Sequence, residues 1–148
     1  MSNKVCVILR PEFHYNEEVI KLLTNVLLAK AKPKMFVADH ITITKEDLIS
    51  LNNSCIIKGL NCDFRNLFQH GDKLYMMFLE CDREEVLYAL YSDSKEKQKI
   101  EKIFHNSREL DDFVIIFKEE SSKILEDFHK SYVNKRAIAS KSETTASV

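Results

Sequence analysis

The sequence predicts an α+β fold in which a single β-sheet has helices packed on it. Three segments have strand character, and they alternate along the chain with segments of helical character. The first strand is apolar on both of its faces, which is typical of a central strand covered on either side. In the other two segments, successive side chains alternate between two faces, as expected of β-strands.

The chain begins with an apolar run, Val5–Leu9, which ends before Pro11 because proline cannot donate to a sheet ladder. Asn16 is a suitable N-cap for a helix over Glu17–Ala29, whose first turn carries acids that favour the positive helix N-terminus. Apolar residues recur along this segment at helical spacing, and Pro33 stops it.

The next segment, Met35–Ile43, is predicted to be a strand with two distinct faces. One face holds Met35, Val37, Asp39, Ile41 and Ile43, and the other holds Phe36, Ala38, His40 and Thr42. Thr44 and Asp47 then have the spacing of a capping box at the start of a helix over Lys45–Leu51. Residues 52–62 lack a clear period, and we expect a loop there.

A brief helix is expected over residues 63–70 and ends at Gly71, because glycine often ends helices. The segment Lys73–Glu80 alternates and predicts a strand. Asp82 then caps a further helix, with Glu85 at the capping-box position. The charged stretch over residues 92–102 is either a helix or an exposed connection, and its mixed charges favour a solvated face over a phosphate-binding patch.

Towards the C-terminus, residues 113–117 fit either a strand or the buried end of a helix, since a short apolar run leaves both open. A helix is expected over residues 121–132. Residues 133–148 are small and polar, which indicates a disordered tail. The sequence therefore predicts one domain over residues 1–132, with a ferredoxin-like order of strands and helices, followed by a tail.

Composition excludes several classes of function. The formal net charge is −1, whereas proteins dedicated to nucleic-acid binding usually carry a basic excess. The chain has 2 glycines, which argues against a glycine-rich phosphate loop. The histidines have no metal-ligand spacing and no CxxC pair occurs, so the sequence predicts no bound metal.

The apolar runs are much shorter than the roughly 20 residues that cross a bilayer, so no membrane contact is expected. The 4 cysteines are irregularly spaced, and the first lies inside a predicted strand, where free buried thiols are common. These features favour a reducing compartment, and we expect a cytoplasmic protein.

Several motifs point to a more specific hypothesis. They are VILRPE at residues 7–12, ITITKEDLISL at 41–51, the strand and helix of 74–90, FHNS at 104–107 and FKE at 117–119. Together they resemble the nucleoside diphosphate kinase family, whose corresponding motifs include IKPD, LTKEQAEEF, VHGS and FFPE. The resemblance covers residues 4–120 and implies homo-oligomers or assembly with other proteins.

The resemblance implies a catalytic role for His105, whose imidazole would attack a γ-phosphate and pass the phosphoryl group on in a second step. Ser107 would help to hold a nearby carboxylate, and Asp112 would be the acid that orients the histidine. The substrates would be nucleoside di- and triphosphates with Mg²⁺, whose charge must be offset during transfer.

Nucleotide-binding roles follow in the same way for Arg10, Phe64 and Lys102, together with Ser107. Arg10 stands where the family has a lysine that contacts phosphate, and arginine differs from lysine in reach and geometry. Phe64 would stack on the base. Lys102 stands where the family has an asparagine, and it offers a cation from a new direction.

Other departures from the family reduce the expected activity. Asn106 follows the histidine where the family has glycine, and Leu87 falls near the position of a phosphate-binding arginine. The segment that precedes the histidine is too short to supply the family's second arginine. The sequence therefore predicts a degenerate nucleoside diphosphate kinase-like protein, with weak or no phosphotransfer, that acts as a nucleotide-binding remnant or an assembly component.

Two alternatives stay open. One is an active nucleoside diphosphate kinase that works through a phosphohistidine at His105. The other is an unrelated α+β module for protein interaction, in which that histidine has no chemical role.

Overall fold

The computed structural model describes residues 3–10, 16–62, 64–92, 95–103 and 114–146. Its centre is a four-stranded sheet with the order β2-β3-β1-β4, in which all neighbouring strands are antiparallel. The strands are β1 (Lys4–Leu9), β2 (Phe36–Thr42), β3 (Lys73–Glu80) and β4 (Val114–Ile116). This is the order of a ferredoxin-like fold, so the predicted fold class is confirmed.

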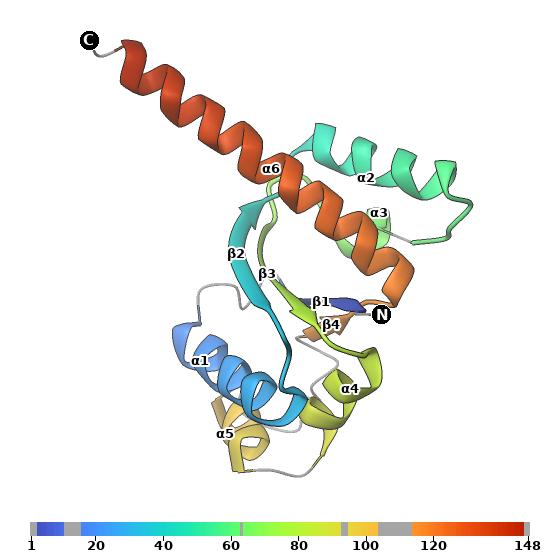
Figure 1. Ribbon diagram of the computed structural model, residues 1–148, viewed down its shortest axis with the longest axis vertical. Helices are drawn as coiled ribbons and strands as arrows, with labels where there is room; N and C mark the ends of the chain where they lie inside the picture. Colours follow the sequence, from blue (N-terminus) through green and yellow to red (C-terminus); the bar gives the residue numbers. More distant parts are fainter. Residues whose placement is uncertain (1–2, 11–15, 63, 93–94, 104–113, 147–148) are drawn as a thin grey trace.

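Helices cover both faces of the sheet (Figure 1). One face carries α1 (Glu17–Val26), which continues into a turn of π-helix over Leu27–Ala31, and α4 (Arg83–Tyr91). The helix α5 (Lys95–Ile103) lies beside α1. The other face carries α2 (Lys45–Ile57), α3 (Phe64–Leu67) and α6 (Glu119–Ala146).

The sheet separates two apolar cores. Alternate residues of β1 point to opposite faces, so Val5, Val7 and Leu9 pack against α1 and α4, whereas Cys6 and Ile8 pack beneath α6. Because β1 is buried on both sides, its unbroken apolar sequence is explained.

Helix caps agree with the sequence at two of three predicted positions. The side chain of Asn16 accepts a hydrogen bond from the backbone of Val19, and Thr44 and Asp47 form a reciprocal capping box. At Asp82 the prediction of a side-chain cap is wrong, because its carboxylate instead accepts a hydrogen bond from Asn3 at 2.8 Å.

Helix α2 continues to Ile57, where the sequence predicted a loop from residue 52. Its buried residues Leu51 and Cys55 extend the apolar face by one more turn. Beyond the C-cap Lys58, Gly59 adopts a positive φ of 68°, and the Leu60 amide donates to the Cys55 carbonyl at 2.8 Å. This is a Schellman ending, which favours glycine at that position.

At the C-terminal end, the open choice for residues 113–117 is decided in favour of a strand over Val114–Ile116, because this segment pairs with β1. The expected disordered tail over residues 133–148 differs from the structure, in which α6 continues to Ala146 without a break at residue 132. The long helix crosses the sheet and extends past α2 (Figure 1).

Candidate functional site

The residues predicted for phosphotransfer divide into two groups. His105, Ser107 and Asp112 lie outside the described residues. Arg10 is half-buried directly after β1, and Lys102 is exposed in the last turn of α5. These two side chains therefore come from a strand end and from a helix on the α1 side of the sheet.

Phe64 lies elsewhere. This residue of α3 is 1% exposed and belongs to the apolar core on the α6 face of the sheet, with its ring centroid 5.9 Å from those of Phe68 and Phe117. This cluster lies on the opposite face of the sheet from α1 and α5. The structure therefore does not bring Phe64 together with Lys102. A base-stacking ring also needs an open face, and this placement argues against the predicted nucleotide-binding role of Phe64.

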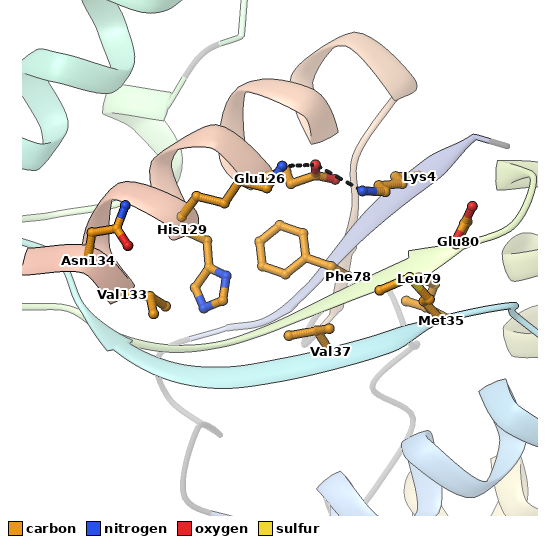
Figure 2. A pocket seen from close by; sticks show the side chains of 11 residues that line it. Lys4, Met35, Val37, Phe78, Leu79, Glu80, Glu126, His129, Val133 and Asn134 are labelled. Carbon is orange, nitrogen blue, oxygen red and sulfur yellow. Dashed lines mark hydrogen bonds and ion pairs between the residues drawn. The ribbon is translucent and has the colours of Figure 1, made fainter. Parts of the chain in front are cut away.

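The structure instead shows a groove that sequence reasoning missed. It has a volume of about 490 Å³ and lies between α6 and the β2–β3 part of the sheet. Figure 2 shows Met35 and Val37 along one side, and His129 and Val133 of α6 along the other. Phe78 forms part of the floor, and its ring stacks on His129 with centroids 5.1 Å apart. The floor of the groove is therefore apolar.

Two ion clusters lie along α6, the first at this groove and the second next to it, sharing His129 with the groove lining. In the first, Lys4 and Lys130 each place Nζ 3.1 Å from the same oxygen of Glu126. In the second, Asp39 of β2 accepts hydrogen bonds from Arg136 at 2.9 and 3.3 Å, and it also contacts Nε2 of His129 at 3.1 Å. Each carboxylate is thus shared by two side chains.

These contacts change the proton affinity of both acids. Burial raises the pKa of Asp39, but hydrogen bonds from Arg136 and His129 outweigh burial and lower the pKa from its ordinary value of 3.8. Burial likewise raises the pKa of Glu126, and hydrogen bonds from Lys130 and Lys4 lower it overall. Both acids are therefore ionised at neutral pH, and His129 donates to Asp39 from Nε2, because a carboxylate can only accept.

One signal in the sequence indicated this cluster. Asp39 shares a strand face with Val37 and Ile41, and an acid on such a face needs a partner when it is partly buried. Its partners were not predictable from spacing, because Arg136 lies 97 positions later and inside the segment expected to be disordered.

The cysteines also differ from expectation, since Cys55 and Cys62 form a disulfide, with Cα atoms 6.2 Å apart. Cys6 and Cys81 are free thiols. Burial and then the charge of Glu126 raise the pKa of Cys6 well above its usual range. The sequence did not identify the pair, because the irregular spacing of the four cysteines gives no pairing pattern.

Within the described ranges, no group of three or more His, Cys, Asp or Glu side chains is arranged to hold a metal ion. None of the helices in these ranges is both long enough and apolar enough to span a bilayer.

Comparisons with known proteins give no relative for this chain. No protein-family model matches it, and no curated protein and no solved structure matches it significantly.

Proposed function

We propose that this chain is a degenerate nucleoside diphosphate kinase-like protein, with weak or no phosphotransfer, that acts as a nucleotide-binding remnant or an assembly component. The observation that carries the proposal is the pairing of Leu9 with Val114 in the order β2-β3-β1-β4. The chain leaves β1 at Arg10 and enters β4 at Val114, so Arg10 lies at the end of β1 where β4 begins.

This arrangement supports a phosphate-binding role for Arg10. Its guanidinium is a permanent cation with several donors, which suits the oxygens of a di- or triphosphate. Mg²⁺ would arrive with the nucleotide, because it binds chiefly through phosphate oxygens and water. A cytoplasmic location, where such nucleotides are available, belongs to the same proposal.

The expected loss of phosphotransfer has an electrostatic reason. The transferred phosphoryl group carries charge on three oxygens, which positioned cations and donors stabilise. Removing one such donor typically costs about 100- to 1000-fold in rate. Here Leu87 is a half-buried apolar residue of α4, near the position of a family arginine. Lys102 replaces an asparagine and is the cation that would compensate.

The test compares the natural protein with His105→Ala after incubation with Mg²⁺ and γ-labelled ATP. We expect little or no acid-labile label in either protein. Rapid labelling that disappears in His105→Ala would contradict the proposal and favour a working kinase.

A second measurement tests nucleotide binding by thermal unfolding with ADP and Mg²⁺. A ligand that binds the folded state stabilises it by about 2.7 kcal/mol at roughly 100 times its Kd. We expect this stabilisation to weaken in Arg10→Ala and to persist in Lys123→Ala, an exposed cation on α6. If neither labelling nor stabilisation occurs, and the protein is monomeric by light scattering, the proposal fails and the unrelated interaction module remains.

A further inference from the structure

Strand β2 lies at one end of the sheet order, and within the described residues no strand pairs with its outer side. Its inner side is defined by two contacts: the Ile43 amide bonds to the Asp72 carbonyl at 2.8 Å, and the Glu80 amide bonds to the Met35 carbonyl at 2.9 Å. Hydrogen-bonding direction alternates along an antiparallel strand. The backbone groups of the even-numbered positions, such as Phe36 and Ala38, therefore point outward.

The groove runs beside this open edge, on the face of the sheet that α6 crosses. Met35 and Val37 point into it and remain 54% and 42% exposed, because α6 covers the inner strands more fully than β2. They are two residues apart, which is the side-chain repeat of a strand. A strand added to the outer edge of β2 would place its own alternate side chains next to them.

Along this side of α6, the cations of the ion pairs are more exposed than the acids that they contact. Lys4, Lys130 and Arg136 have side chains that are 42%, 65% and 51% exposed, whereas the carboxylates beneath them, Glu126 and Asp39, are 16% and 20% exposed. The exposed Lys34 precedes β2, and Glu80 is a further acid of the lining. A partner that approaches these ion pairs therefore meets the cations before it meets their half-buried acids, and this order of exposure favours a partner with negative charge.

We propose that this groove binds an extended acidic peptide segment of another protein, which adds to β2 as a further strand. The outward-pointing backbone groups of β2 select an extended chain, because such a chain satisfies them in sequence. The apolar floor takes the alternate side chains that face α6. The exposed lysines and Arg136 pair with acidic residues that flank the apolar ones.

This site is separate from the proposed nucleotide site. Lys4 lies at the groove, whereas Arg10 follows the opposite end of β1. The whole length of this strand therefore separates the two residues, at a rise of about 3.3 Å per residue. The peptide proposal therefore stands whether or not the protein binds a nucleotide.

The probe is a fluorescein-labelled synthetic peptide as long as β2, in which valine and threonine alternate and aspartates flank both ends. We expect saturable binding by fluorescence anisotropy, which weakens as salt is added because the flanking charges are solvent-exposed. We also expect shifts of the Phe36 and Ala38 amide signals in NMR spectra. The same peptide with N-methyl groups on alternate amides, which cannot pair with a strand edge, should bind at least about tenfold more weakly.

Two variants of the protein test the floor and the charge separately. Val37→Glu places a carboxylate among the apolar side chains of the groove and should weaken binding by about tenfold or more, since that charge repels the aspartates of the peptide and removes an apolar contact. The matched control is Ile57→Glu, on an 84% exposed side chain of α2, and should bind as the natural protein does. Lys130→Gln should weaken binding and reduce its salt dependence, while Lys123→Gln, on the same helix, should not.

Three results would overturn the proposal. The first is absence of binding at peptide concentrations up to about 1 mM, with Val37→Glu and the natural protein equally folded. The second is equal binding of the N-methylated peptide, which would indicate a site for small amphipathic molecules. The third is a dimer that Val37→Glu dissociates and that excludes the peptide, which would assign this face to a second copy of the chain.

Discussion

The guanidinium group of Arg136 holds the carboxylate of Asp39 through two hydrogen bonds, of 2.9 and 3.3 Å, across 97 positions of the chain. This contact joins the second half of α6 to the outermost strand β2. His129, about two helical turns earlier on α6, contacts the same carboxylate at 3.1 Å. The helix is thus attached to the sheet by polar contacts beyond the point where its apolar contacts with the core end.

The first prediction concerns the length of α6. A chain that ends after Tyr132 lacks Val133 and Arg136, and we expect its melting temperature to fall by a few degrees because Asp39 loses a partner. A chain that ends after Ala139 keeps both residues and should have the same melting temperature as the natural protein. Calorimetry of the two truncated chains measures this. Equal melting of all three proteins would show that Arg136 adds no stability.

The second prediction concerns pH. The folded-state pKa of Asp39 is lowered, so on acidification the unfolded chain takes up its proton first. The stability from this carboxylate is therefore present above its unfolded-state pKa of about 3.9 and is lost as pH falls through the lower folded-state value. Urea unfolding between neutral and strongly acidic pH measures this loss.

Asp39→Asn should flatten the acid branch of that stability profile, whereas Glu120→Gln, an exposed acid at the start of α6, should leave its shape unchanged. An acid branch of the same steepness in Asp39→Asn would contradict the role assigned to Asp39. Glu126, whose pKa is also lowered, accounts for part of the remaining slope.

The third prediction concerns Ser122, a buried hydroxyl where α6 begins. Its oxygen accepts a hydrogen bond from the Cys6 amide at 2.9 Å, and its hydroxyl donates to the Phe117 carbonyl at 3.3 Å. Ser122→Ala leaves that buried amide without its acceptor, which typically costs about 1–3 kcal/mol of unfolding free energy. Ser121→Ala, at the neighbouring half-buried position, should cost less than about 0.5 kcal/mol. Equal effects of the two substitutions in urea unfolding would refute this assignment.

The fourth prediction concerns the thiols. Protein that is purified in air and unfolded in an alkylating reagent should label Cys6 and Cys81, while Cys55 and Cys62 become labelled after reduction. In the folded protein both free thiols should react slowly. Burial and the charges of nearby acids raise the pKa of Cys81 to about 11, and Cys6 is fully buried.

Mass spectrometry of labelled peptides distinguishes the sites. The Cys55–Cys62 disulfide closes a short loop of the chain. In the chain-entropy model this should stabilise the fold by about 2 kcal/mol, so reduction of the disulfide should lower the urea midpoint of unfolding. Labelling of Cys55 and Cys62 without reduction, in protein purified in air, would contradict the disulfide.

The strands β1, β2 and β3 were predictable because their signals are local. Alternation over Lys73–Glu80 identified β3 with its observed bounds, and the apolar run of β1 indicated burial on both faces. Caps at Asn16 and Thr44 involve contacts within three residues, so they were visible in the sequence. The end of α2 was missed because exposed isoleucines, Ile56 and Ile57, obscured the period of its buried face.

The sequence by itself therefore determined three of the four strands, most of the helices and the fold class, because backbone preferences and side-chain periods act over a few residues, whereas β4 was decided by its pairing with β1. The tertiary structure decided which distant groups meet. It buried Phe64 in the core, joined Asp39 to Arg136, and left Met35 and Val37 exposed beside an open strand edge. Those outcomes depend on how far α6 extends across the sheet, and no local pattern encodes the path of a helix relative to a strand nearly a hundred residues earlier.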